Sequence, residues 1–176
     1  IYTNVTYPIP KTMPKVQEEN GNGLYIREFE VAADWVNNDD RVVLAFEGVE
    51  SFYYVWVNGN AVGVNKGSRE QTEFDITEYV HAGTNTIAVH VIRWSDGMWM
   101  EDQDMWRMSG IYRDVYLYSK PNVQIRDFFV KTKLDAEYKN ANMNVEVKVR
   151  NEIRTDCPPQ KVQLGLYDDK GNNLIP

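Results

Sequence analysis

The chain has 176 residues and 43% hydrophobic residues, enough for one full core but not for two ordinary domains of roughly 100 to 200 residues. Its formal net charge is −7, from 26 acidic and 19 basic residues, and the basic residues form no cluster that would neutralise a phosphate backbone. These features exclude an intrinsically disordered protein and a nucleic-acid-binding protein.

The first two thirds of the chain alternate between apolar and polar side chains over short stretches, which is the pattern of half-buried strands. The proline-rich residues before Leu24 are expected to form a surface arm. Asn58-Gly59 suits a tight hairpin turn, and residues 86–93 are expected to pair with residues 111–118. The predicted strands are residues 24–31, 41–46, 53–57, 61–64, 72–76, 86–93 and 111–118.

A boundary is predicted at Lys120-Pro121, which divides the chain into domains at residues 1–119 and 120–176. Three further strands are expected at residues 123–132, 143–151 and 161–167, before a turn at 169–172. An immunoglobulin-like sandwich needs about seven strands, so the second domain is expected to be incomplete and the chain truncated. The fold class is all-β, an antiparallel sandwich.

The connection between Arg93 and Ile111 is much longer than a sandwich hairpin needs, and long loops of this kind are usually functional. Aromatic rings stack on the apolar faces of sugars, and carboxylates accept hydrogen bonds from hydroxyls, so the loop composition suits sugar recognition. The alternative is that the tryptophans plug the end of the sandwich. The residues concerned are Trp94, Asp96, Trp99, Glu101, Asp102, Asp104, Trp106 and Arg107.

Hydrolysis of a glycosidic bond requires two carboxyl groups held on opposite sides of the bond. Glu101, Asp102 and Asp104 are close in sequence, but nothing predicts a rigid frame that would hold two of them in that way. We therefore predict no catalytic residue in this chain. An acidic loop can also bind a hard cation, although no spaced calcium-loop pattern is present.

The remaining reactive residue types have structural interpretations. Cys157 is the single cysteine and cannot form an internal disulfide, so it is predicted to be a loop thiol. His81 and His90 are predicted to be structural histidines on a turn and a strand.

Several segments together resemble one family, the large bacterial β-galactosidases of glycoside hydrolase family 2. The resemblance rests on Ile1 to Pro8, Ser68-Arg69, Arg93 to Gly97, and above all Glu101 to Val115. It implies a sugar-binding jelly roll followed by an immunoglobulin-like domain, with both catalytic glutamates on a later (β/α) barrel that lies outside this chain.

The resemblance also implies site residues, cofactors and partners. Asn4 and Val5 on the arm and Asp104 on the long loop would bind substrate, and Asp104 would help to bind a sodium ion. Sodium and magnesium are implied for the parent enzyme, with no cofactor in this part alone. The implied partners are a β-galactoside and the remaining domains, with a homo-oligomeric parent.

Other loop residues are expected to be supports. Glu101 and Asp102 are predicted to pair with Arg107 or Arg113, and Arg93, Trp106 and Arg107 to hold the loop in shape. The segment Gly97 to Met100 departs from the family pattern through its bulky methionine and tryptophan residues.

The leading hypothesis is therefore a β-galactosidase fragment that shapes the galactose subsite and is inactive alone. An autonomous carbohydrate-binding module, or a structural domain that holds subunits together through Trp99 and Met100, is the alternative. No apolar run reaches the roughly 20 residues that span a membrane, and the first residues lack the charged-then-apolar order of a signal peptide. No membrane partner is predicted, and the cytoplasm is favoured over the periplasm.

Overall fold

The structure is a computed structural model that describes residues 12–38, 40–101, 107–152 and 157–175. The chain divides into two compact units, residues 1–122 and 123–176, and each is described by itself. The regular secondary structure of the described residues is almost entirely antiparallel strand, so the predicted all-β sandwich class is confirmed. None of its helices has the length and apolar character to cross a bilayer.

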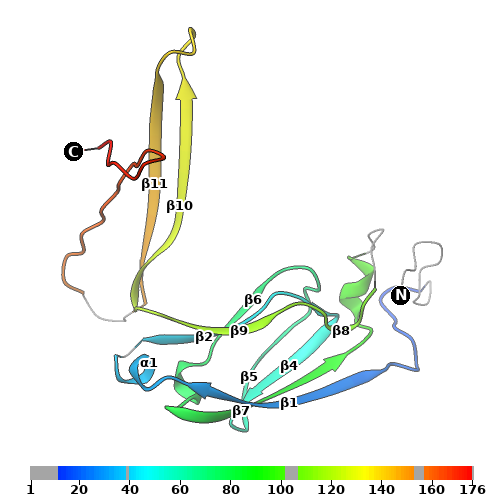
Figure 1. The fold of residues 1–176 in the computed structure, drawn as a ribbon. Helices are drawn as coiled ribbons and strands as arrows, with labels where there is room; N and C mark the ends of the chain where they lie inside the picture. The colour runs from blue at the N-terminus through cyan, green and yellow to red at the C-terminus, as the bar shows by residue number, and fades with distance from the viewer. Residues whose placement is uncertain (1–11, 39, 102–106, 153–156, 176) are drawn as a thin grey trace. The chain divides into compact units, whose positions relative to one another are not determined.

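The described residues of unit 1 form nine strands, one short α-helix and two 3-10 turns (Figure 1). The strands are β1 (Asn22–Val31), β2 (Arg41–Phe46), β3 (Val49–Glu50), β4 (Phe52–Val57), β5 (Asn60–Asn65), β6 (Thr72–Asp75), β7 (Gly83–Ile92), β8 (Gly110–Ile111) and β9 (Val115–Lys120). The helix is α1 (Ala33–Asn37), and the turns are η1 (Thr77–Tyr79) and η2 (Asp96–Trp99).

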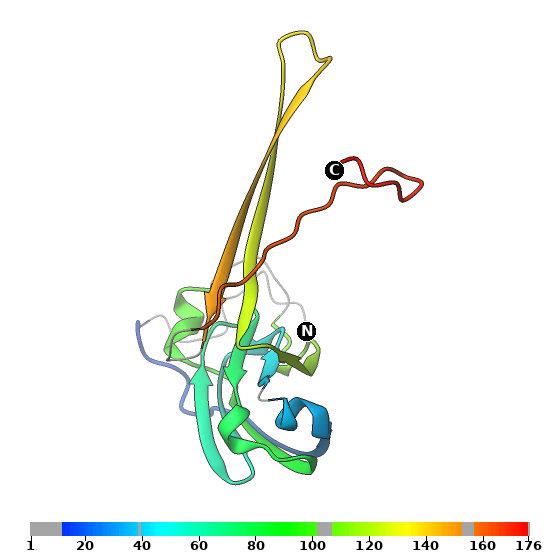
Figure 2. The ribbon, with the colours of Figure 1, turned by 90° about the vertical axis from the view of Figure 1, so that its left-hand side faces the viewer.

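Two sheets face each other to form the sandwich, as Figures 1 and 2 show. One sheet has the strand order β1-β7-β4-β5, the other has the order β6-β2-β9, and β3 pairs with β8 as a short ladder. Asn58 and Gly59 have φ values of 49° and 79°, so the predicted tight hairpin between β4 and β5 is confirmed.

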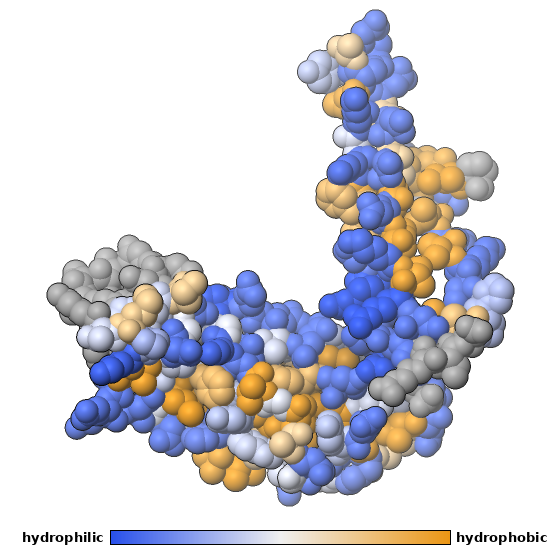
Figure 3. Space-filling view, turned by 180° about the vertical axis from the view of Figure 1, so that it is seen from behind, coloured by the Kyte–Doolittle hydropathy of each residue, from blue (hydrophilic) through white to orange (hydrophobic). Residues whose placement is uncertain are grey.

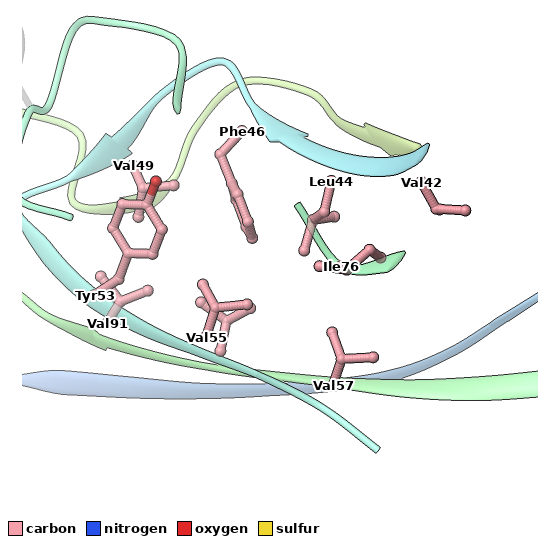
Figure 4. Packing of buried hydrophobic residues seen from close by; sticks show 10 residues of the cluster. Val42, Leu44, Phe46, Val49, Tyr53, Val55, Val57, Ile76 and Val91 are labelled. Carbon is pink, nitrogen blue, oxygen red and sulfur yellow. The ribbon is translucent and has the colours of Figure 1, made fainter. Parts of the chain in front are cut away.

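The core lies between the two sheets. Phe46 and Leu44 of β2 point toward Tyr53 and Val55 of β4 (Figure 4). Phe46 contacts the Tyr53 ring at a centroid distance of 5.1 Å. Alternation in β4 and β7 therefore places one face of each strand in this core, as the sequence predicted.

One predicted pairing is wrong. Residues 86–93 were expected to pair with 111–118, but β7 pairs with β1 and β4, and β9 pairs with β2 in the opposite sheet. The reason is that the long loop after β7 carries the chain from one layer of the sandwich to the other, so its two ends need not be neighbours.

In the part of unit 2 that the structure describes, the named strands form a single long hairpin, β10 (Val123–Leu134) and β11 (Ala141–Asn151). The strand predicted at residues 161–167 is wrong, because residues 157–166 form no ladder and Tyr167 makes only an isolated bridge with Asn173. The alternation of that segment has no described neighbouring strand to pair with. Apolar side chains of unit 2 appear at the surface in Figure 3.

Candidate functional site

The arm and the long loop meet at one end of the sandwich. The side-chain amide of Asn20 donates to the Trp94 carbonyl at 2.7 Å, and its oxygen accepts from the Trp94 backbone N–H at 2.9 Å. Trp99 Nε1 donates to the Lys15 carbonyl at 3.1 Å. The bases of these two segments, far apart in sequence, are therefore joined by hydrogen bonds.

A small apolar cluster lies beneath this junction. Trp94 and Met98 are buried, and Val16 of the arm and Trp99 pack against them. Trp94 is therefore buried among loop and arm residues, in a cluster separate from the core between the sheets, and its ring has little surface left for stacking on a sugar. The bulky Gly97–Met100 segment contributes a buried Met98 and an arm-binding Trp99, whereas Met100 is 84% exposed.

The start of the loop is held by charged contacts. The Arg93 guanidinium stacks over the Trp94 ring at 4.7 Å, as expected of a loop support. Lys66 Nζ lies 2.9 Å from Asp96 Oδ1, and this hydrogen bond holds the pKa of Asp96 below its ordinary value. Because both side chains are about half exposed, we attribute little stability to the pair.

Glu101 supports the loop, but through a partner that the sequence did not predict. Its Oε1 accepts a 2.7 Å hydrogen bond from the backbone N–H of Ser68. Arg113, one of the two arginines expected to pair with it, instead donates to the carbonyls of Arg69 and Glu47. For Glu101 Oε1, a backbone amide of the connection between β5 and β6 takes the place of that cation.

The loop re-enters the sandwich through two residues with left-handed backbone. Ser109 has φ 61° and Gly110 has φ 74°, and the Ser109 N–H donates to Glu50 Oε2 at 2.9 Å. A β-carbon at Gly110 would lie 2.6 Å from the Tyr25 hydroxyl, so a larger residue there would require the Tyr25 side chain to move and would adopt a strained backbone. Glu50 is 1% exposed, and its carboxylate provides a buried hydrogen-bond acceptor for the Ser109 N–H of this turn.

An open pocket of about 260 Å³ lies beside this re-entry point. Its lining residues are Gly21, Asn22, Gly23, Tyr25, Val91, Arg93, Ser109 and Gly110.

The three residues predicted to bind substrate, Asn4, Val5 and Asp104, lie outside the described residues, as do Asp102 and Trp106. Both histidines have contacts of a structural kind: His81 reaches the Ala82 carbonyl, and His90 stacks on Tyr54. Cys157 lies in coil and forms no disulfide.

Glu50 and Ser68 hold the two ends of the loop, and the sequence analysis did not predict this for either of them. Nothing in the two-residue strand β3 signals that the Glu50 carboxylate will be fully buried. Ser68 was visible only as part of the Ser68-Arg69 segment that carried the family resemblance.

The described part of unit 1 has the architecture of a two-layer antiparallel β-sandwich domain. A family model described as glycosyl hydrolases family 2, sugar binding domain, matches residues 1–121. The chain belongs to this family.

Relatives cover the whole chain. A β-galactosidase of Priestia megaterium is 44% identical over 99% of this chain, and one of Yersinia pestis bv. Antiqua (strain Angola) is 48% identical over 96%. The chain spans only 17% of the length of each.

Solved structures agree with the fold. A β-glucuronidase from an uncultured Clostridium sp. matches with a TM-score of 0.60 and 29% identity over 75% of this chain and 24% of that chain. A Bacteroides uniformis β-glucuronidase matches with a TM-score of 0.63 and 25% identity, over 76% of this chain and 17% of that chain.

Proposed function

We propose that this chain is the N-terminal part of a retaining β-galactosidase and that it shapes the subsite for the terminal galactose. The observation that carries the proposal is the identity of 44–48% with proteins named β-galactosidase over nearly the whole chain. The catalytic pair of carboxylates that hydrolysis requires is then supplied by residues outside this chain.

The architecture of unit 1 supports a binding role. The arm that carries Asn4 and Val5 and the loop that carries Asp104 have bases joined through Asn20–Trp94 and Lys15–Trp99. Because the described parts of the arm and the loop are hydrogen-bonded to each other, residues further along both segments can contact the same ligand. In that role Asn4 would both donate and accept hydrogen bonds, and Asp104 would accept them from two neighbouring hydroxyls.

The charge of the loop favours a neutral sugar over a glucuronide, even though the named structural neighbours are β-glucuronidases. Residues 94–109 contain four carboxylates, Asp96, Glu101, Asp102 and Asp104, against one arginine. A glucuronide carries its own carboxylate, which this acidic segment would repel.

The sodium and magnesium of the parent remain proposals. Among the described residues, no group of three or more His, Cys, Asp or Glu side chains is arranged to hold a metal ion. The sodium proposal therefore depends on Asp104 and on groups outside the described ranges, and we derive no chemical step through either ion.

The test is to express the full protein that contains this chain and to compare nitrophenyl β-galactoside with nitrophenyl β-glucuronide. We expect hydrolysis of the galactoside and not of the glucuronide. Asp104→Asn should lower kcat/KM about 10- to 100-fold, because a hydrogen bond to a charged group contributes about 1.5–3 kcal/mol. A glucuronidase, or an unaffected variant, would contradict the proposal.

The chain alone is expected to be inactive and to bind galactose only weakly, since a few hydrogen bonds of about 1 kcal/mol each do not offset the cost of association. Titration of isotope-labelled chain with galactose tests this. Micromolar binding at the long loop would favour the autonomous carbohydrate-binding module instead.

Of the two residues proposed to contact another subunit, Trp99 and Met100, only Met100 is fully exposed for such a contact. Met100 is available as an exposed side chain, but Trp99 is half-buried against the arm. Sedimentation of the full protein tests the proposed homo-oligomer, with Met100→Lys as the variant.

A further inference from the structure

Residues 102–106 are flanked on both sides by residues that carboxylates hold in place. Both carboxylates also lie against the same connection, the turn between β5 and β6. On one flank, Glu101 Oε1 accepts from the Ser68 N–H at 2.7 Å. On the other flank, Glu50 Oε2 accepts from the Ser109 N–H at 2.9 Å, and Glu50 Oε1 lies 3.8 Å from Arg69 Nη2. We define Glu50, Ser68, Arg69 and Glu101 as the clamp.

The clamp is shielded from water. Glu50 and Ser68 are fully buried, and the second oxygen of Glu101 is excluded from solvent. Hydrogen bonds to charged groups are stronger in such surroundings than at the surface. Breaking one of them leaves a buried charge or amide without its partner, so the clamp resists movement of either flank.

Tyr112 fastens the turn to the rest of the sandwich. Its hydroxyl donates to the Ser68 carbonyl, and Arg69 Nη1 donates to that hydroxyl at 3.3 Å. Arg113 Nη1 donates to the Arg69 carbonyl at 3.1 Å. The residues that follow β8 therefore fix the same turn that the two carboxylates use.

We propose that the clamp residues Glu50, Ser68, Arg69 and Glu101 are positioning residues for sugar binding. They touch no substrate; they hold the two ends of the segment that contains Asp104 at fixed points. Binding groups must be held close to their productive geometry, and small displacements reduce affinity strongly. That Asp104 contacts galactose rests on the proposed function, whereas the anchoring of its flanks does not.

The first experiment measures anchoring without any sugar. In Glu101→Ala of this chain, the amide hydrogen exchange of Ser68 should accelerate about tenfold, because one charge-assisted hydrogen bond is lost. Glu101→Gln retains an acceptor oxygen and should stay close to the original rate. Glu70→Ala removes an exposed glutamate of the same connection and is the matched control. An unchanged Ser68 rate in Glu101→Ala would overturn the clamp.

A milder variant covers the case in which Glu101→Ala does not fold. Tyr112→Phe removes only the hydroxyl that binds the Ser68 carbonyl, and it should accelerate exchange at Ser68 about threefold, the loss of one ordinary hydrogen bond. Core amides of β4 and β7 report whether the sandwich remains intact. No acceleration at Ser68 would overturn the use of this turn as a fixed point, because the Tyr112 hydroxyl is the contact that joins the turn to the residues after β8.

The second experiment uses the full protein and measures positioning. Glu101→Ala should raise KM for the galactoside and the inhibition constant of galactose about tenfold, with a smaller change in kcat, and Glu101→Gln should restore both. Equal loss in the Ala and Gln variants, or faster exchange with unchanged KM, would overturn positioning. If the full protein hydrolyses no galactoside, the proposed function fails while the exchange result still stands.

Discussion

The two units use the same kind of strand with opposite results. In unit 1 the apolar faces of β2, β4 and β7 meet in a closed core, and Phe46 is 1% exposed. In unit 2 the hairpin β10–β11 has no covering layer among the described residues, and Phe128 is 67% exposed. An alternating pattern is therefore enough to form strands, but their apolar side chains are removed from water only where a second layer covers them.

The largest expected effect is at Phe46. Phe46→Ala removes a ring packed against Tyr53 and Phe74 and should lower the free energy of unfolding of unit 1 by about 3–5 kcal/mol. Phe128→Ser in β10 is the counterpart and should change stability by less than about 0.5 kcal/mol. Urea unfolding followed by circular dichroism measures both. Similar losses at the two positions would mean that the hairpin is covered in solution.

A second effect concerns a buried polar network in unit 1. Asn85 is buried, accepts from the Asn58 side chain and the His81 N–H, and donates to the carbonyls of His81 and Gly83. Asn85→Ala leaves these groups unpaired and should cost about 2–4 kcal/mol in the same unfolding experiment.

The matching control for Asn85 is Asn172 of unit 2, whose side chain donates to Asp168 at an exposed turn. Asn172→Ala should have a far smaller effect, since water replaces the lost partner. A large loss there would contradict the contrast between a buried and a solvated network.

Two glycines with left-handed backbone sharpen the comparison further. Gly110→Ala should destabilise unit 1 by about 1–2 kcal/mol from its backbone conformation alone, and by more because of the Tyr25 hydroxyl. Gly171→Ala has the same backbone strain but open space around it. Tyr25→Phe combined with Gly110→Ala should recover part of the loss, and no recovery would show that contact with the hydroxyl is unimportant.

The smallest expected effect is a pH dependence in unit 2. A hydrogen bond from the Asn172 side chain, with help from the Asn172 backbone amide, holds the pKa of Asp168 below its ordinary value. A lowered carboxyl pKa stabilises the turn above the unfolded pKa of about 3.9, and this is lost as pH falls through the folded pKa. An NMR titration should show the Asn172 amide shifting at low pH, and Asp168→Asn should abolish that transition.

The contrast between the units also explains where prediction from sequence succeeded. Most strands of unit 1 and the Asn58-Gly59 hairpin followed from alternation and turn chemistry, because both depend on near neighbours in sequence. The single strand expected at residues 111–118 is wrong, because the structure divides it into β8 and β9, and β3 was not predicted. The expected strand at residues 161–167 failed, since a strand also needs a partner and the described chain provides none there. The pairing of β7 failed because it depends on which layer each strand joins.

At the candidate site, the types of residue could be predicted from the sequence, whereas their contacts could not. The sequence by itself determined an all-β chain with an aromatic, acidic loop and a family resemblance, because composition and local periodicity are properties of near neighbours. Three contacts could be seen only in the folded chain: Glu101 accepts a hydrogen bond from the Ser68 amide, buried Glu50 accepts one from the Ser109 amide, and Asn20 of the arm is hydrogen-bonded to Trp94. These contacts join residues 33 to 74 positions apart, and strand pairing between distant segments sets two of them: β1 with β7 brings Asn20 to Trp94, and β3 with β8 brings Glu50 to Ser109.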